Sequence, residues 1–294
     1  MTSADALIGL DAPAKPALHA GDVPPLVLVF GMAALALAWN ISTGLTFTLP
    51  FVVVVAGPLA ALALAFFYTR VRPEQRIAEI ALYAGLWLFY PAFGAALTYL
   101  ATALNFPLRD GLFMAADRML GFDWMGWARF VLVHPSFKLI SDAAYSSCFW
   151  QPLAAILIFA FWGPKNRNGE FITSVLIGLL LTILVYALLP TIGPADSQHI
   201  RATGQIVETL RSGYKGPYTY VGIVAFPSFH TVMAILFTVA QRGNRWLLAG
   251  FGLLNLVMLT AVPFQGDHYL VDMIAGAGIA ALAFFATKRV YRFI

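Results

Sequence analysis

Long apolar runs constrain the fold of this chain more than any other feature of its sequence. The run Phe171–Leu189 contains no charged residue, and a helix needs about 20 apolar residues to cross the hydrocarbon core of a bilayer. Hydrophobic residues make up 60% of the 294 residues and charged residues 11%. This composition is typical of a polytopic membrane protein, and the fold class we predict is an all-α bundle of transmembrane helices.

The apolar runs predict about eight transmembrane helices and divide the chain into three parts. Residues 1–24 are rich in Ala, Pro and Asp and lack the basic start of a secretory signal, so we expect a disordered cytoplasmic tail. Residues 25–70 would form two N-terminal helices, and residues 71–294 a domain built on six more. The expected spans are Pro25–Leu45, Phe47–Tyr68, Ile77–Leu104, Leu139–Trp162, Phe171–Leu189, Pro227–Ala240, Trp246–Phe264 and His268–Thr287.

Residues 105–136 interrupt this pattern, because charged residues separate apolar and aromatic ones at helical spacing. Two interpretations fit the segment. It is either an interfacial helix whose Trp124 and Trp127 lie at headgroup depth, or a soluble hairpin packed on the spans.

Basic residues in short loops predict the orientation of the chain. If the N-terminus is cytoplasmic, the inner segments are the more basic ones, as the positive-inside rule requires. Their basic residues are Arg70, Arg72, Arg76, Lys165, Arg167, Arg242, Arg245, Lys288, Arg289 and Arg292. Both termini are then cytoplasmic, and in a bacterium the other face is the periplasmic side of the inner membrane. The net charge of +4 therefore reflects orientation, and we infer no nucleic-acid binding from it. The single cysteine, Cys148, excludes a disulfide within the chain.

The first candidate motif is Phe226-Pro227-Ser228-Phe229-His230. Pro227 suits the first position of a helix. The free N–H groups of Ser228 and Phe229 would then bind an anion such as phosphate, with the helix dipole and the Ser228 hydroxyl assisting. His230, in the same first turn, is placed to give a proton to a leaving oxygen.

The second candidate motif is His268-Tyr269-Leu270-Val271-Asp272. His268 and Asp272 are four residues apart, on one face of the first turns of the last span. A carboxylate bound to one ring nitrogen fixes the tautomer and leaves the other nitrogen as a nucleophile. An acid inside an apolar helix also requires a partner or a wet cavity, and His268 is the available partner.

Other interpretations of these residues remain open. Each histidine alone is commonly an interfacial polar residue. Two histidines and an aspartate could ligate zinc, with His199 as the fourth ligand. A His–Asp pair could also serve as the proton relay of a transporter, although the inverted repeats of transporters are not evident.

Both motifs resemble the second and third signature motifs of the phosphatidic acid phosphatase type 2 superfamily. The His-Tyr-x-x-Asp form and the preceding Phe-Pro-Ser are similar in particular to the inositol phosphorylceramide synthase branch and, at the same histidines and aspartate, to sphingomyelin synthases. The resemblance covers roughly residues 75–290, so the first two spans are an addition to a six-helix catalytic core. The segment Asn105–Trp124 also resembles one found in bacterial members of this branch.

The resemblance implies a phosphohistidine mechanism on a phospholipid or lipid phosphate, without metal or other cofactor. His268 attacks phosphorus, Asp272 orients it and His230 protonates the leaving group. Water resolves the phosphoenzyme in phosphatases, whereas a lipid alcohol does so in transferases. Val262 stands where the phosphatase form of the third motif has arginine, and the lysine and Arg-Pro of the first phosphatase motif are absent. These departures favour an inositolphosphotransferase-like enzyme, with a lipid phosphatase as the alternative.

A cation should still neutralise the phosphate. The candidates are Arg201, Arg211 and Lys215 in the loop before the first motif. Arg109 and Arg118 are alternatives, and Asp142 could pair with one of these residues. For each of these five cations, a solvated loop charge or a contact with a lipid headgroup is the more common role.

Overall fold

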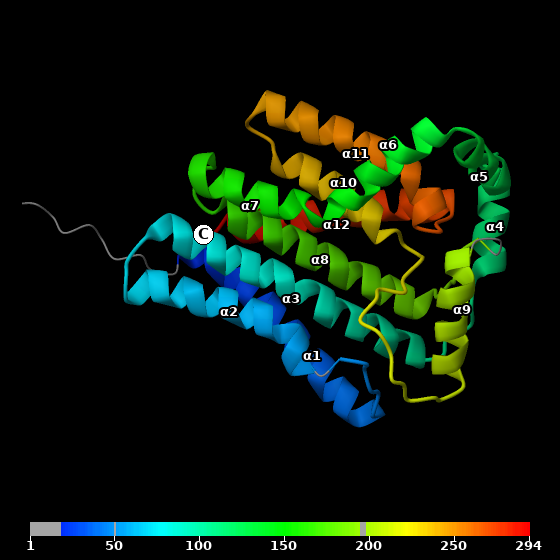
Figure 1. The fold of residues 1–294 in the computed structure, drawn as a ribbon, viewed down its shortest axis with the longest axis horizontal. Helices are drawn as coiled ribbons and strands as arrows, with labels where there is room; N and C mark the ends of the chain where they lie inside the picture. The colour runs from blue at the N-terminus through cyan, green and yellow to red at the C-terminus, as the bar shows by residue number, and fades with distance from the viewer. Residues whose placement is uncertain (1–18, 50, 195–197) are drawn as a thin grey trace, which may run out of the picture.

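The computed structural model describes residues 19–49, 51–194 and 198–294, which form helices and their connections. Long helices lie side by side along the molecule, and α4, α5 and α9 lie across one end (Figure 1). The elements are η1 (Ala20–Asp22), α1 (Val23–Thr43), α2 (Phe51–Arg70), α3 (Gln75–Ala103), α4 (Asp110–Met119), α5 (Trp124–Val133), α6 (Pro135–Ser146), η2 (Ser147–Phe149), α7 (Gln151–Trp162), α8 (Arg167–Leu188), α9 (Gln198–Arg211), α10 (Phe229–Ala240), α11 (Arg245–Gln265) and α12 (Leu270–Tyr291). The all-α class is confirmed.

The first eighteen residues of the predicted tail lie outside the described residues. Of its remaining residues, Ala20 to Pro24 are helical, because η1 and the start of α1 cover them. Pro24 and Pro25 at the start of α1 suit this position, since the first turn of a helix has no use for their missing N–H groups.

Six helices of the described chain are long and apolar enough to cross a membrane: α1 (with η1), α2, α3, α8, α11 and α12. The predicted span Leu139–Trp162 is instead covered by two helical segments, α6 with η2 and then α7. The two segments are bent by 55° at the break between them. The predicted span Pro227–Ala240 is α10, which has 12 residues and rises only about 18 Å. Eight spans are therefore reached only if the bent pair and α10 are both counted.

The segment 105–136 forms two short helices, α4 and α5, where one interfacial helix was the first interpretation. Trp124 Nε1 donates to the carbonyl of Pro263 at 2.8 Å, and Trp127 Nε1 to that of Thr260 at 3.2 Å. Both tryptophans are thus fastened to α11. These contacts place α5 against α11, and both the interfacial and the hairpin interpretation of the segment remain predictions.

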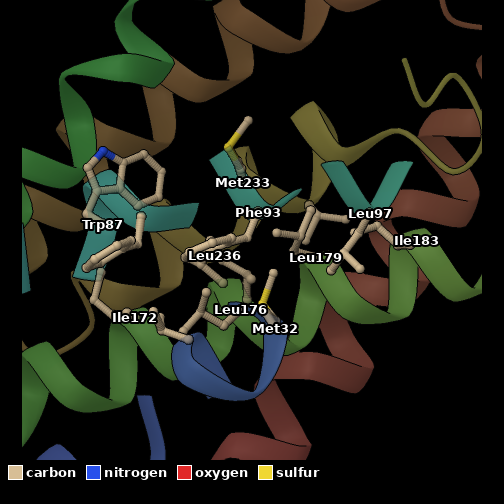
Figure 2. Packing of buried hydrophobic residues seen from close by; sticks show 14 of the residues in the cluster. Met32, Trp87, Phe93, Leu97, Ile172, Leu176, Leu179, Ile183, Met233 and Leu236 are labelled. Atoms are coloured by element: carbon tan, nitrogen blue, oxygen red, sulfur yellow. The ribbon is translucent and has the colours of Figure 1, made fainter. Parts of the chain in front are cut away.

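The centre of the bundle is formed by α3 and α8. Their most apolar windows are 67% and 61% buried, against 17% for α1 and α2. Side chains from α1, α3, α8 and α10 meet in the core (Figure 2), among them Met32, Trp87, Phe93, Leu97, Ile172, Leu176, Leu179, Ile183, Met233 and Leu236. Hydropathy alone could not rank these spans, because all are apolar and burial depends on their neighbours.

Glu170 ties together three basic residues at the end of the bundle opposite α4. It pairs with Lys288 at 2.8 Å, with Arg242, and with Arg167 at 3.9 Å. These cations belong to the segments that the positive-inside count assigned to the cytoplasm. The cluster therefore joins α8, the α10–α11 loop and the last turn of α12.

Candidate active site

The two sequence motifs, about forty residues apart, come together at the end of the bundle near α4. His230 lies in the first turn of α10, and His268 lies just before α12. Their ring centroids are 5.8 Å apart at an interplanar angle of 68°. One phosphoryl group can therefore be reached by both imidazoles.

His268 and Asp272 form a buried pair. Nδ1 of His268 is 3.4 Å from Oδ2 of Asp272, at the long end of hydrogen-bond distances, and the two residues are 1% and 0% exposed. Contact of Nδ1 with the carboxylate leaves Nε2 as the nitrogen that can act as a nucleophile.

The prediction that His268 lies within the last helix is wrong. α12 begins at Leu270 with Tyr269 as its N-cap, and the Asp272 carboxylate accepts the backbone N–H of Tyr269 at 2.8 Å. A carboxylate at this position satisfies amides that a helix start leaves unpaired. His268 still reaches Asp272 from outside the helix. Asp267 before it has a φ of 53°, in the left-handed region.

The start of α10 also differs from the prediction. Pro227 follows a cis peptide bond and precedes the N-cap, which is Ser228, so it is not the first helical residue. The Ser228 hydroxyl accepts the N–H of Thr231 at 3.3 Å. Its own N–H donates to the carbonyl of Asp272 at 2.9 Å, so the expected free amide is absent. Among the described residues, the N–H of Phe229 has no acceptor, and it can still donate to an anion.

Tyr145, near the end of α6, is a site residue that the sequence analysis missed. Its hydroxyl lies 2.8 Å from Nε2 of His230, and the centroids of the two rings are 4.6 Å apart with the ring planes tilted by 31°. The contact joins residues 85 positions apart. No local sequence pattern marks such a partner.

Two aspartates of the 105–136 segment hold the site together from α4. Asp117, 4% exposed, accepts the N–H groups of Leu270 and Val271 at 2.9 Å each. These are first-turn amides of α12, which a carboxylate stabilises both by hydrogen bonds and by the helix dipole. Asp110 likewise accepts the N–H groups of Ile192 and Gly193 at 3.0 Å each. The sequence signal that could have pointed to this role is an acidic residue on an otherwise apolar face of a helix.

An aromatic cluster of Phe113, Phe226 and Tyr269 covers this junction, separate from the main core. Phe113 of α4 stacks on Phe226 with centroids 4.1 Å apart. Burial raises the pKa of Tyr269, and the nearby carboxylates of Asp110 and Asp272 add to the rise. The hydroxyl therefore stays protonated and donates to the carbonyl of Gly193 at 3.1 Å.

Gly276 permits close approach of the two motif-bearing helices. A Cβ atom there would lie 2.5 Å from the carbonyl oxygen of Ser228 and 3.1 Å from Cβ of Thr231. A side chain on this face of α12 would thus push α12 away from the start of α10. The spacing of the motifs depends on this contact.

The predicted phosphate-binding cations are not brought to the histidines by the described contacts. The side chain of Arg201 lies outside the described residues, as does that of His199. Nη1 of Arg211 donates to the carbonyl of Phe106 at 2.7 Å. The carbonyl of Lys215 accepts the N–H of Thr46 at 2.7 Å, and its side chain is exposed.

Pairing of Asp142 with one of the loop cations was considered, but its described partners are other residues. It pairs with Lys138 one turn earlier, at 2.5 Å, and accepts the side-chain amide of Gln265. Gln265 ends α11, three residues before His268. Val262, at the position of the phosphatase arginine, is fully buried. Within the described residues, no group of three or more His, Cys, Asp and Glu side chains is placed to hold a metal ion.

The fold and the site define the class of protein: a helical integral membrane protein with a buried His–Asp pair facing a second histidine. Comparison with known families identifies it further. The family model described as PAP2 superfamily matches residues 112–286, which is more than half of the chain, and the chain belongs to this superfamily. Membership indicates a membrane enzyme of the phosphatase or phosphotransferase type. Searches of curated proteins and of solved structures find no match.

Proposed function

We propose that this protein cleaves or transfers a phosphorylated lipid headgroup through a phosphohistidine intermediate on His268. The observation that carries the proposal is the facing pair of histidines, 5.8 Å between centroids, with Asp272 at Nδ1 of His268. In this arrangement His268 would be the nucleophile, Asp272 the group that orients it, and His230 the acid, within reach of one phosphorus.

In the first step, Nε2 of His268 attacks phosphorus and the bond from phosphorus to the leaving oxygen breaks. His230 gives its proton to that oxygen, while Asp272 stabilises the positive charge that develops on the His268 ring. In the second step, water or an alcohol loses its proton to His230 and attacks the phosphohistidine. The bond between nitrogen and phosphorus breaks and both histidines return to their starting states.

We favour an inositolphosphotransferase-like reaction with a lipid alcohol as acceptor, and hydrolysis by water is the alternative. The support for transfer is the form of the motifs and the apolar Val262 in place of an arginine. Ser228 and the N–H of Phe229 would contact the phosphate, and Arg201, Arg211 and Lys215 remain candidate cations.

We place the reaction at the outer face of the membrane, which is periplasmic if the organism is a bacterium, with both termini cytoplasmic. The distribution of basic loop residues supports this orientation. We also retain the division into a tail (residues 1–24), two added helices (25–70) and a catalytic domain (71–294). The family match at residues 112–286 falls inside the last of these.

The test is an assay of the purified protein with phosphorylated lipids, following free phosphate and headgroup transfer to an added lipid alcohol. His268→Ala should abolish both products and the trapping of phosphate on the protein. His134→Ala is the matched control, because His134 is an exposed histidine at the end of α5. Equal turnover by the wild type and His268→Ala would exclude the phosphohistidine. Activity that disappears in EDTA and returns with zinc would favour the metal alternative.

A further inference from the structure

A cavity lined by both charged and apolar side chains lies at the other end of the bundle from the histidines. Its volume is about 970 Å³, at the upper end of the roughly 300–1,000 Å³ typical of small-molecule sites. It is lined by η1, the second half of α2, the first turns of α3 and the α7–α8 connection. The length of α12, about 33 Å from its 22 residues, separates it from His268, because Tyr291 at the far end of α12 donates to Gly21 at 2.6 Å.

The inner wall of this cavity is acidic. Asp22, 9% exposed, accepts the hydroxyl of Tyr83 and the N–H of His19, so both of its oxygens are engaged. Glu79 has Oε1 bound to the side-chain amide of Asn168 at 2.8 Å. Its Oε2 is left to accept a further hydrogen bond. An acidic residue within a candidate membrane span implies a functional partner.

The outer wall carries two cations and an apolar surface. Among the described residues, neither Arg70 nor Lys165 has a carboxylate within salt-bridge distance, and both are exposed. Leu62 and Phe66 of α2 continue the wall along the face of a candidate span. The charged groups lie at the loop end and the apolar groups toward the bundle centre. This order matches the headgroup layer and the acyl-chain layer of one membrane leaflet.

We propose that this cavity binds one aminophospholipid from the leaflet at the Arg70–Gln75 end of the bundle. The phosphate contacts Arg70 and Lys165, the primary ammonium donates to Oε2 of Glu79, and an acyl chain lies along Leu62 and Phe66. The charges on the two walls are of opposite sign, as in this headgroup. The site does not depend on the proposed function of the histidines.

The test is native mass spectrometry of the full-length protein in detergent with phosphatidylethanolamine, phosphatidylcholine or phosphatidylglycerol. We expect one phosphatidylethanolamine to bind preferentially, because phosphatidylcholine has no N–H donor on its cation and phosphatidylglycerol has no cation. Glu79→Gln should weaken phosphatidylethanolamine binding by roughly tenfold, as for loss of a charge-assisted hydrogen bond. It should leave phosphatidylglycerol binding unchanged, which shows that the variant is folded.

Matched controls come from the adjacent loop. Glu74→Gln and Arg72→Gln alter exposed residues that do not line the cavity, and they should bind like the wild type. The double variant of Arg70→Gln and Lys165→Gln should weaken all three lipids. The proposal is overturned if the wild type binds the three lipids equally. It is also overturned if Glu79→Gln retains full preference for phosphatidylethanolamine. In that case the lipid binds at another site, such as the histidine site.

Discussion

At the scale of single residues, the contacts that organise the histidines divide into local and distant ones. His268 and Asp272 are four residues apart, and Ser228 and His230 share one turn, so the sequence motifs already contained them. Tyr145 reaches His230 across 85 positions, and Asp117 reaches Leu270 across 153. Such pairings depend on how helices pack, and one sequence carries no local pattern for them.

Tyr145→Phe tests whether the hydroxyl orients His230. The variant keeps the ring contact with His230 and removes the 2.8 Å contact with Nε2. We expect kcat to fall by up to about tenfold with KM nearly unchanged, since one hydrogen bond contributes about 0.5–1.5 kcal/mol. Steady-state kinetics would measure this. Tyr214→Phe, in an exposed loop, is the control, and an equal effect of both variants would contradict an orienting role.

Asp117→Ala tests the clamp from α4. The substitution leaves the amides of Leu270 and Val271 without their carboxylate, and each unpaired buried group costs about 1–3 kcal/mol. We therefore expect a lower Tm and a lower kcat, because His268 lies two residues before the released turn. Asp123→Ala changes an exposed aspartate before α5 and serves as the comparison. A kcat and Tm equal to the wild type in Asp117→Ala would show that α4 does not position His268.

At the scale of helices, the length of an apolar run predicted that a span exists better than it predicted whether the span is straight or broken. The six long spans follow from uninterrupted apolar runs. The break between α6 and α7 was missed, because Ser146, Ser147 and Cys148 are small residues that do not interrupt the run, and only the 55° bend reveals two helices. Short α10 was counted as a span because no Asp, Glu, Lys or Arg interrupts residues 227–240. Its start was located by Pro227 and Ser228, although the N-cap proved to be the serine.

Gly276→Ala tests whether the approach of α12 to α10 sets the spacing of the histidines. The new Cβ would lie 2.5 Å from the carbonyl of Ser228, and overpacking of this kind costs about 1–3 kcal/mol. Loss of activity and a lower Tm are expected. Gly278→Ala on the same helix meets nothing within 4 Å, so it should gain up to about 1 kcal/mol of helix propensity. Identical behaviour of the two variants in thermal unfolding would contradict the close-approach argument.

At the scale of the whole molecule, the two ends of the bundle differ in their loop charges and in the sites that they carry. The cluster around Glu170 and the cavity near Glu79 lie at the end whose loops are basic. The starts of α10 and α12, next to which His230 and His268 lie, are at the other end together with α4 and α9 (Figure 1). The difference between the two ends could be predicted from the sequence, because the positive-inside rule uses only the number of basic residues in each loop. The sequence could not predict the cavity, which arises from packing between α2, α3 and the α7–α8 connection.

The orientation is tested by single-cysteine labelling in intact cells. The native Cys148 is the single cysteine and is buried, so its background reaction with a membrane-impermeant maleimide should be low. Ser212→Cys, beside the end of α9, should be labelled from outside, because we place the histidine end at the outer face. Glu74→Cys, in the α2–α3 loop, should be labelled only after the membrane is permeabilised. The reverse pattern would place the histidines on the cytoplasmic side and would restrict their substrates to lipids of the inner leaflet.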